Sequence, residues 1–406
     1  MGYFTHTVKG VTWIGALRVF TRAISYGRTA LIARILSPTQ FGIYGIASLV
    51  LSLLEILTET GINVFLVQNE EKVERFINAA WLISIIRGVV ISILIFLFSG
   101  LVADFFNVTD VKPLIVLISI VPLIRGFINP SIVKFQKNLE FQKEFYYRSV
   151  IFLVESAVSV ALVIFTLSPI ALIWGLVAGA IFEVGISFIF VRPVPKLFFE
   201  FSSVKQIFKK GKWMTLTGIF AYFFHNGDNI VVGKILGAGS LGIYDMAYKL
   251  SILPITEVAA VISQVTFPVY VRIGQDKKRL RRAFGRTLLL VSTISLPIGA
   301  IFILFSREIV LTILGPKWTS SIQILQVLAI FGVIRAITSC ANAVFLALKR
   351  QEYVTIITLS GLIALSLIIV PFIRIFGLIG VGLAVTVATV ATIPFVLYYL
   401  WIVFRD

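Results

Sequence analysis

INAAWLISIIRGVVISILIFLFSGL, residues 77–101, contains a single charged side chain, Arg87. A helix needs about 20 consecutive apolar residues to cross the hydrocarbon core of a bilayer, so this stretch predicts a membrane-spanning helix. The whole chain shares this composition, since 58% of its 406 residues are hydrophobic and 14% are charged. Soluble domains are about 45–50% apolar and about 25% charged. The composition therefore predicts an all-α integral membrane protein and argues against a soluble enzyme.

Similar apolar stretches recur along the chain and predict about 12 transmembrane helices. The first six are expected over 11–33, 41–67, 77–101, 113–133, 148–167 and 169–191. The second six are expected over 213–233, 241–269, 287–306, 320–346, 353–373 and 377–403. The chain start does not fit a cleavable signal peptide, because three arginines interrupt the first apolar segment.

The charges of the loops predict an orientation. The chain has 36 Lys and Arg against 19 Asp and Glu, a net charge of +17. With the N-terminus inside, 23 of the basic residues fall in cytoplasmic segments, 6 in the opposite loops and 7 within spans. Cytoplasmic loops of membrane proteins carry an excess of Lys and Arg, so both termini are expected in the cytoplasm. The positive charge then needs no nucleic acid as a partner.

The chain contains two related halves. At an offset of 200 residues, Arg34-Ile35-Leu36 aligns with Lys234-Ile235-Leu236, and Phe41-Gly42-Ile43-Tyr44 aligns with Leu241-Gly242-Ile243-Tyr244. Because each half holds an even number of helices, the halves share one orientation and are related by an axis along the membrane normal. We therefore expect two pseudo-symmetric six-helix bundles, 1–199 and 200–406, flanking a cleft and working by alternating access.

Charged residues within the spans suggest a hydrated, anion-binding cleft. Each costs about 2.5–3.5 kcal/mol at mid-bilayer unless it faces water or a partner. Arg18 and Arg22 lie four residues apart on one helix face, and the guanidinium group grips phosphate oxygens through two parallel hydrogen bonds. Polar residues on the corresponding faces of other helices are expected to line the same cleft. The predicted substrate-binding residues are Arg18, Arg22, Arg28, Arg125, Arg335, Tyr222, His225, Asn229 and Asn342.

Other roles for these charges stay open. Arg22 and Arg125 could pair with Glu59 or Glu55 and only join helices. Arg28 could extend its side chain to the membrane–water interface (snorkelling). Arg87 has no polar stripe around it, so a structural or snorkelling role is favoured. Glu155 and Glu183 could form a helix-packing pair. Three acids could instead bind and release a coupling H⁺ or Na⁺ as access alternates; they are Glu55, Glu59 and Asp228.

Signals for catalysis are absent. The chain has no GxxxxGK[ST] loop, no HExxH run, a single cysteine and two histidines. These motifs hold nucleotide phosphates and catalytic zinc, so we expect a transporter rather than an enzyme, with no metal and no cofactor.

Four sequence elements carry a family likeness. They are Arg34-Ile35-Leu36-Ser37-Pro38-Thr39-Gln40-Phe41-Gly42-Ile43-Tyr44, the run Asp228–Gly237 with Leu241-Gly242-Ile243-Tyr244, Leu139-Glu140-Phe141, and Gly315-Pro316-Lys317-Trp318. With them the chain resembles Wzx-like polysaccharide flippases of the O-antigen, colanic acid and teichuronic acid type. These belong to the multidrug/oligosaccharidyl-lipid/polysaccharide (MOP) exporter superfamily, whose fold consists of two six-helix bundles.

The resemblance implies a flippase for surface polysaccharide biosynthesis. Its cargo would be undecaprenyl-diphosphate-linked oligosaccharide repeat units, moved from the cytoplasmic to the outer leaflet of a bacterial plasma (inner) membrane. Expected partners are this lipid-linked oligosaccharide, membrane lipids, and a polysaccharide polymerase and chain-length regulator. Two alternatives remain: a cation-coupled multidrug (MATE-like) exporter, and a non-transporting membrane scaffold that docks through the basic residues between Arg272 and Arg286.

Overall fold

The computed structural model describes residues 3–57, 66, 76–196 and 201–405. Its Cα positions form two compact units, Met1–Gly239 and Ser240–Asp406. Every regular element in the described residues is helical, which agrees with the predicted all-α class. The first unit extends past the predicted boundary at 199/200 to Gly239, which lies inside the long helix α10 (Phe201–Ile273), and the predicted boundary stays a prediction.

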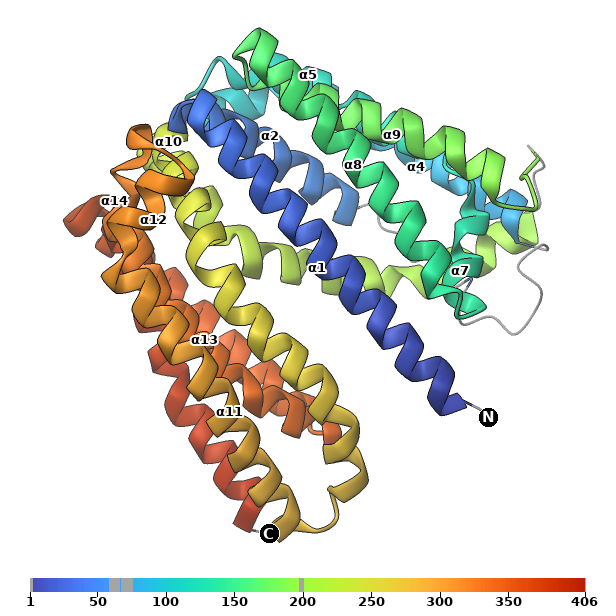
Figure 1. The fold of residues 1–406 in the computed structure, drawn as a ribbon. Helices are drawn as coiled ribbons and strands as arrows, with labels where there is room; N and C mark the ends of the chain where they lie inside the picture. Colours follow the sequence, from blue (N-terminus) through green and yellow to red (C-terminus); the bar gives the residue numbers. More distant parts are fainter. Residues whose placement is uncertain (1–2, 58–65, 67–75, 197–200, 406) are drawn as a thin grey trace. The chain divides into compact units, whose positions relative to one another are not determined.

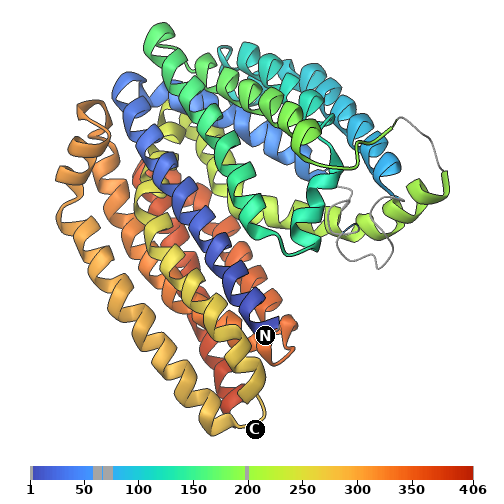
Figure 2. The same cartoon turned by 45° about the vertical axis from the view of Figure 1, so that its right-hand side comes forward.

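The first unit is built from long apolar helices. In both views α8 and α9 lie side by side (Figures 1 and 2). Its elements are α1 (Tyr3–Ile35), α2 (Pro38–Leu57), α4 (Ile77–Phe106), α5 (Val111–Ile118), α6 (Ile120–Arg125), η2 (Pro130–Val133), α7 (Lys134–Lys137), α8 (Phe141–Thr166), α9 (Ile170–Phe190) and the beginning of α10 (Phe201–Ile273).

The fourth predicted span is bent rather than straight. Residues 111–125 and 130–137 meet at an angle of 73°. Asn129 fixes the bend: its Oδ1 accepts from the Ser131 N–H at 2.9 Å, and its Nδ2 donates to the Val191 carbonyl at 3.2 Å. Because Pro130 has no N–H to continue the helix, the chain turns here. Arg125 is the last residue of α6 and lies just before this turn.

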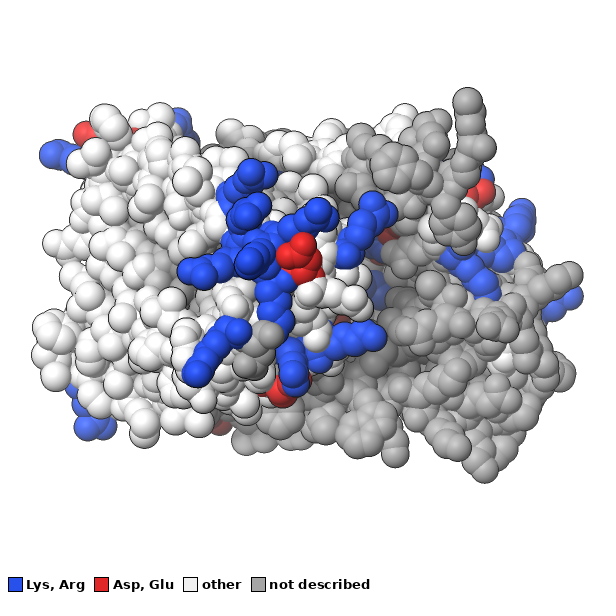
Figure 3. All heavy atoms as spheres, turned by 90° about the horizontal axis from the view of Figure 1, so that it is seen from below, with Lys and Arg blue, Asp and Glu red and all other residues white. Residues whose placement is uncertain are grey.

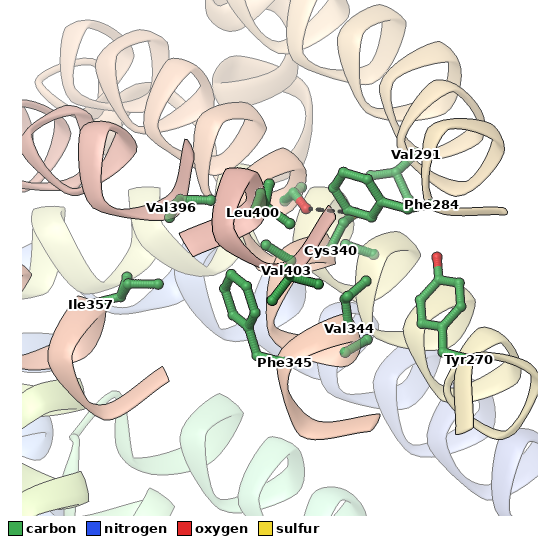
Figure 4. Close-up of a cluster of buried hydrophobic side chains, with 14 of the residues drawn as sticks. Tyr270, Phe284, Val291, Cys340, Val344, Phe345, Ile357, Val396, Leu400 and Val403 are labelled. Atoms are coloured by element: carbon green, nitrogen blue, oxygen red, sulfur yellow. Dashed lines mark hydrogen bonds between the residues drawn. The ribbon is translucent and has the colours of Figure 1, made fainter. Parts of the chain in front are cut away.

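The second unit contains the rest of α10, α11 (Lys277–Leu304), α12 (Ser306–Ile313), η3 (Pro316–Trp318), α13 (Ser321–Ala347) and α14 (Gln351–Arg405). A continuous apolar core joins α10, α11, α13 and α14 (Figure 4). It includes Tyr270, Phe284, Phe345 and Val403, together with the buried thiol of Cys340.

Two helices are too long for one span. α10 has 73 residues and α14 has 55, and at about 1.5 Å per residue each exceeds two bilayer cores. Each breaks at a glycine with positive φ, Gly237 (φ 81°) and Gly377 (φ 58°), a conformation that glycine adopts without steric cost. Counting both halves of α10 and α14, α1 and the bent fourth span, the described residues form the predicted twelve helices.

One repeat motif explains a close helix contact. Gly42 of α2 lies against the backbone of Ala238, so that a Cβ at position 42 would overlap the Ala238 carbonyl oxygen. We expect Gly42→Ala to lower stability by about 1–3 kcal/mol, the usual cost of overpacking, as measured by thermal unfolding in detergent. Gly27→Ala on α1 is the control, because a Cβ there meets nothing within 4 Å. Equal melting temperatures for the two variants would contradict this contact.

Candidate substrate-binding pocket

A charged pocket of about 420 Å³ lies inside the first unit. Pockets for small-molecule ligands span about 300–1,000 Å³. The volume of this one lies at the lower end of that range, so it can hold a small polar ligand or the polar head of a larger one. Residues from α2, α4, α6, η2, α8 and α9 surround it. The lining consists of Glu55, Ser84, Arg87, Gly88, Ile91, Pro122, Arg125, Gly126, Ile128, Pro130, Ile132, Arg148 and Glu183.

Three arginines and two glutamates give the pocket lining a net positive charge. Arg125 pairs with Glu55, with Nη1 and Oε1 at 3.2 Å, and these side chains keep 36% and 32% of their surface exposed. The pair is therefore open to the pocket and is not locked in a solid interior. This exposure lets the Arg125 guanidinium meet an anion while Glu55 orients it.

Arg87 is held by the same residue of α2. Its Nη2 donates to the backbone carbonyl of Glu55 at 2.6 Å. Glu55 belongs to α2, so this helix holds one arginine through its backbone and one through its side chain.

Glycines bring the two arginines together. A Cβ at Gly88 would overlap the Pro122 carbonyl oxygen, and one at Gly126 would lie 2.9 Å from the Ser84 oxygen. α4 and α6 therefore cross with their backbones in contact, as small residues allow in membranes. Since Arg87 and Arg125 each precede one of these glycines, the crossing places both at the same wall of the pocket.

Arg148 completes the basic lining from α8. Its Nε binds Glu144 Oε1 at 2.8 Å, and half of the side-chain surface stays exposed. Glu183 enters from α9, whose backbone carbonyl at this residue accepts a hydrogen bond of 3.5 Å from the Tyr147 hydroxyl. Among the described residues, no three His, Cys, Asp or Glu side chains group closely enough to hold a metal ion.

Most of the other predicted site residues of the first unit lie outside this lining. Arg18 and Arg22 are exposed on α1. Arg28 pairs with Glu155 at 2.9 Å. The buried Tyr222 hydroxyl donates to the Leu49 carbonyl at 2.8 Å.

The polar residues of α10 near its break differ from one another in burial. His225 is exposed, whereas Asp228 is buried. The Asp228 carboxylate accepts a hydrogen bond of 2.9 Å from the Asn229 backbone N–H. The Asn229 Oδ1 is buried and has no hydrogen-bond partner within the described structure. Glu59 lies outside the described residues.

Two predicted residues belong to the second unit. Arg335 binds the Tyr248 hydroxyl at 3.1 Å and lies over the Phe331 ring at 5.7 Å. Asn342 is half-buried on α13. A cleft shared by these two residues and the first unit stays a prediction.

Three residues of the pocket were absent from the predicted site: Arg87, Arg148 and Glu183. The sequence favours a structural or snorkelling role for Arg87 and allows a helix-packing pair of Glu183 with Glu155. The Arg-Gly dipeptides at 87–88 and 125–126 are the signal that could have identified the first of them. The glycines mark a helix crossing, and the arginines lie beside it.

Comparison with known proteins gives the family. A family model described as "Polysaccharide biosynthesis protein" matches residues 31–323. The chain belongs to this polysaccharide biosynthesis protein family. The lipopolysaccharide biosynthesis protein WzxC of Escherichia coli K12 is 27% identical over 349 residues, which cover 85% of this chain and 71% of WzxC. The predicted likeness to Wzx-like polysaccharide flippases is confirmed.

Solved structures of a lipid II flippase and of a multidrug transporter share the fold of this family member. The lipid II flippase MurJ in an inward closed conformation matches with a TM-score of 0.76 and 18% identity, covering 96% of this chain and 87% of MurJ. An inward-facing MATE multidrug transporter of the MOP superfamily matches with a TM-score of 0.67 and 16% identity, covering 95% and 96%. The chain is therefore a multi-pass membrane protein with the MOP exporter fold.

Proposed function

We propose that this protein is a flippase for undecaprenyl-diphosphate-linked oligosaccharide repeat units in surface polysaccharide biosynthesis. It would carry them from the cytoplasmic to the outer leaflet of a bacterial plasma membrane by alternating access, and it would make or break no bond. The observation that carries the proposal is the convergence of Arg87, Arg125 and Arg148 on one pocket among membrane-spanning helices. Family membership and the transporter fold support it.

The chemistry of the pocket suits a diphosphate. Guanidinium groups stay charged at any physiological pH and form paired hydrogen bonds with phosphate oxygens. In a site of low dielectric, such charge-assisted bonds are stronger than in water. Glu55 would keep Arg87 and Arg125 in position before the head group arrives. The sugars would extend from the pocket toward the other predicted contacts, while the polyprenyl tail stays in lipid.

The remaining assignments belong to this proposal. Both termini would be cytoplasmic, as the loop charges predict. Glu55, Glu59 and Asp228 would take up a coupling H⁺ or Na⁺. At Glu55, a bound cation would neutralise the carboxylate and free Arg125 for the diphosphate. A polysaccharide polymerase and a chain-length regulator would receive the translocated unit.

Reconstitution of the purified protein alone tests this function. Vesicles containing a fluorescent undecaprenyl-diphosphate-linked oligosaccharide would be assayed for label that becomes accessible to a reagent outside. We expect protein-dependent movement well above that of protein-free vesicles. Movement equal to protein-free vesicles would contradict the proposal, and transport of an organic cation such as ethidium without lipid movement would favour a multidrug exporter.

A further inference from the structure

Ten basic side chains gather at one end of the second unit. They come from three segments: the last turn of α10 with the first part of α11, the α13–α14 turn, and the end of α14. All are exposed except Lys277, which is partly buried, and Figure 3 shows Lys and Arg side chains gathered on the face seen from below. The sequence of these segments also has three acids, Asp276, Glu352 and Asp406, which leaves a net charge of +7. The basic platform consists of Arg272, Lys277, Lys278, Arg279, Arg281, Arg282, Arg286, Lys349, Arg350 and Arg405.

The core of the unit assembles this platform. Phe284 of α11 packs on Phe404 near the chain end, with ring centroids 5.7 Å apart. A Cβ at Gly274 would lie 3.1 Å from Leu348, so the α10–α11 connection touches the α13–α14 turn. Tyr353 stacks on Tyr399 at 4.2 Å and joins both halves of α14. Segments far apart in sequence are thereby fixed side by side.

Three basic residues of the platform lie in one stripe along the exposed side of α11. Leu280, Phe284 and Thr287 are buried, and Lys278, Arg282 and Arg286 lie on the opposite side of the helix. Residues four apart share a helix face. Further along α11 this outward side carries Leu289, 68% exposed, and Leu296, 53% exposed. The stripe therefore passes from charge to apolar surface within one helix, as it would at the level of lipid headgroups.

The end of α14 marks the same level. Tyr398 and Trp401 are exposed and stack with ring centroids 6.4 Å apart, and the Arg405 guanidinium lies 4.6 Å from the Trp401 ring centroid. Exposed Trp and Tyr residues gather at membrane–water interfaces. The aromatic pair therefore places the platform next to the headgroups.

Few of the ten charges are balanced within the protein. Among the described residues, ion pairs hold Arg279 to Asp276 at 3.2 Å and Arg350 to Glu352 at 3.5 Å, and no other platform residue has one. Lys277 and Lys278 also occupy the first turn of α11, where the helix dipole disfavours cations. An external anion would relieve both sources of repulsion.

We infer that the basic platform binds anionic phospholipid headgroups of the leaflet at this end of the unit. In the orientation given under the proposed function this leaflet is the cytoplasmic one, and this assignment of the leaflet rests on that proposal. The ligand is a phosphodiester headgroup such as phosphatidylglycerol, because clusters of Lys and Arg beside membrane helices attract anionic lipids. The bound lipids would hold the α10–α11 and α13–α14 ends of the unit at the membrane surface.

Lipid binding to matched variants tests the inference. The platform variant Lys278→Gln/Arg282→Gln/Arg286→Gln removes three charges from the stripe. The control Arg307→Gln/Lys317→Gln/Arg374→Gln removes three exposed charges from α12, η3 and α14 of the same unit, outside the platform. Each detergent-purified protein would be titrated with phosphatidylglycerol and with phosphatidylethanolamine, and bound lipid read by native mass spectrometry and by thermal stabilisation.

We expect the platform variant to bind phosphatidylglycerol at least tenfold more weakly than wild type, and the control to bind as wild type does. Equal loss in both variants, or equal binding of the two lipids by wild type, would overturn the inference. So would tight binding of an acidic polypeptide such as polyglutamate with no preference for phosphatidylglycerol, which would indicate a protein partner. This experiment measures lipid binding, so its result is independent of whether the protein flips the lipid-linked oligosaccharide.

Discussion

Arg125→Ala is expected to lower flipping of the lipid-linked oligosaccharide about 100-fold in reconstituted vesicles. Hydrogen bonds to charged groups contribute about 1.5–3 kcal/mol each, and each 1.4 kcal/mol is a factor of ten. Losing two parallel bonds to a diphosphate costs about 3 kcal/mol at the lower end of this range, which predicts a loss of about 100-fold. Lys112→Ala is the matched control, because it removes one exposed charge from the same unit outside the pocket, and it should transport at the wild-type rate.

The ion pair between Arg125 and Glu55 offers a competing reason for such a loss. Its removal would take this ion pair away from Glu55 and could disturb the packing of α2 on its neighbours. The exchange Glu55→Arg/Arg125→Glu separates the two explanations, because it restores a pair across the same 3.2 Å contact but moves the guanidinium to α2.

We expect the exchange to return the melting temperature most of the way to that of wild type, while flipping stays low. Arg125→Lys should retain charge without the paired hydrogen bonds and should transport at an intermediate rate. If the exchanged protein flips lipid as wild type does, Arg125 serves helix packing alone and the proposed head-group site is wrong.

The helices were predictable because hydrophobic length depends on the sequence alone. The breaks at Gly237 and Gly377 fall at or beside the intervals between predicted spans. The bend of the fourth span was missed although Pro130 lies within it, because a proline in a membrane helix need not break it. What turns the chain is the set of hydrogen bonds from Asn129 to the end of α9, and such a partner distant in sequence is not visible in a hydropathy profile.

The site was predictable only in part, for a related reason. Polar stripes on single helices led to Arg125 and Glu55, which do line the pocket. Arg87 has no polar stripe around it, and its role follows from the crossing of α4 and α6 at Gly88 and Gly126. The face of one helix can be derived from its sequence, but which faces meet depends on the packing of several helices.

Arg28 shows the same limit. Its sequence position suggested a substrate contact or snorkelling, and Glu155 was expected near Glu183. In the structure Arg28 Nη1 binds Glu155 Oε1 at 2.9 Å across α1 and α8, with 20% and 13% of the side-chain surfaces exposed. The Phe152 ring lies 5.4 Å from the guanidinium carbon. This pair is more deeply buried than Arg125–Glu55 and joins two helices of the first unit.

We expect Arg28→Met and Glu155→Leu each to lower the free energy of unfolding by about 3–5 kcal/mol, the cost of leaving one buried charge without its partner. The double variant should recover most of this loss, since replacing a buried pair by apolar residues of similar size is close to neutral. Unfolding by SDS, followed by circular dichroism, measures all three. Losses that simply add in the double variant would show that the two side chains do not depend on each other.

Transport by the double variant then decides what Arg28 does. If the pair only joins α1 to α8, a folded double variant flips lipid at a rate close to wild type, because the Arg87, Arg125 and Arg148 pocket is intact. If Arg28 contacts the diphosphate as its sequence position suggests, restored stability does not restore flipping. Because the two outcomes differ in rate at equal stability, this experiment separates a residue that builds the transporter from one that binds its cargo.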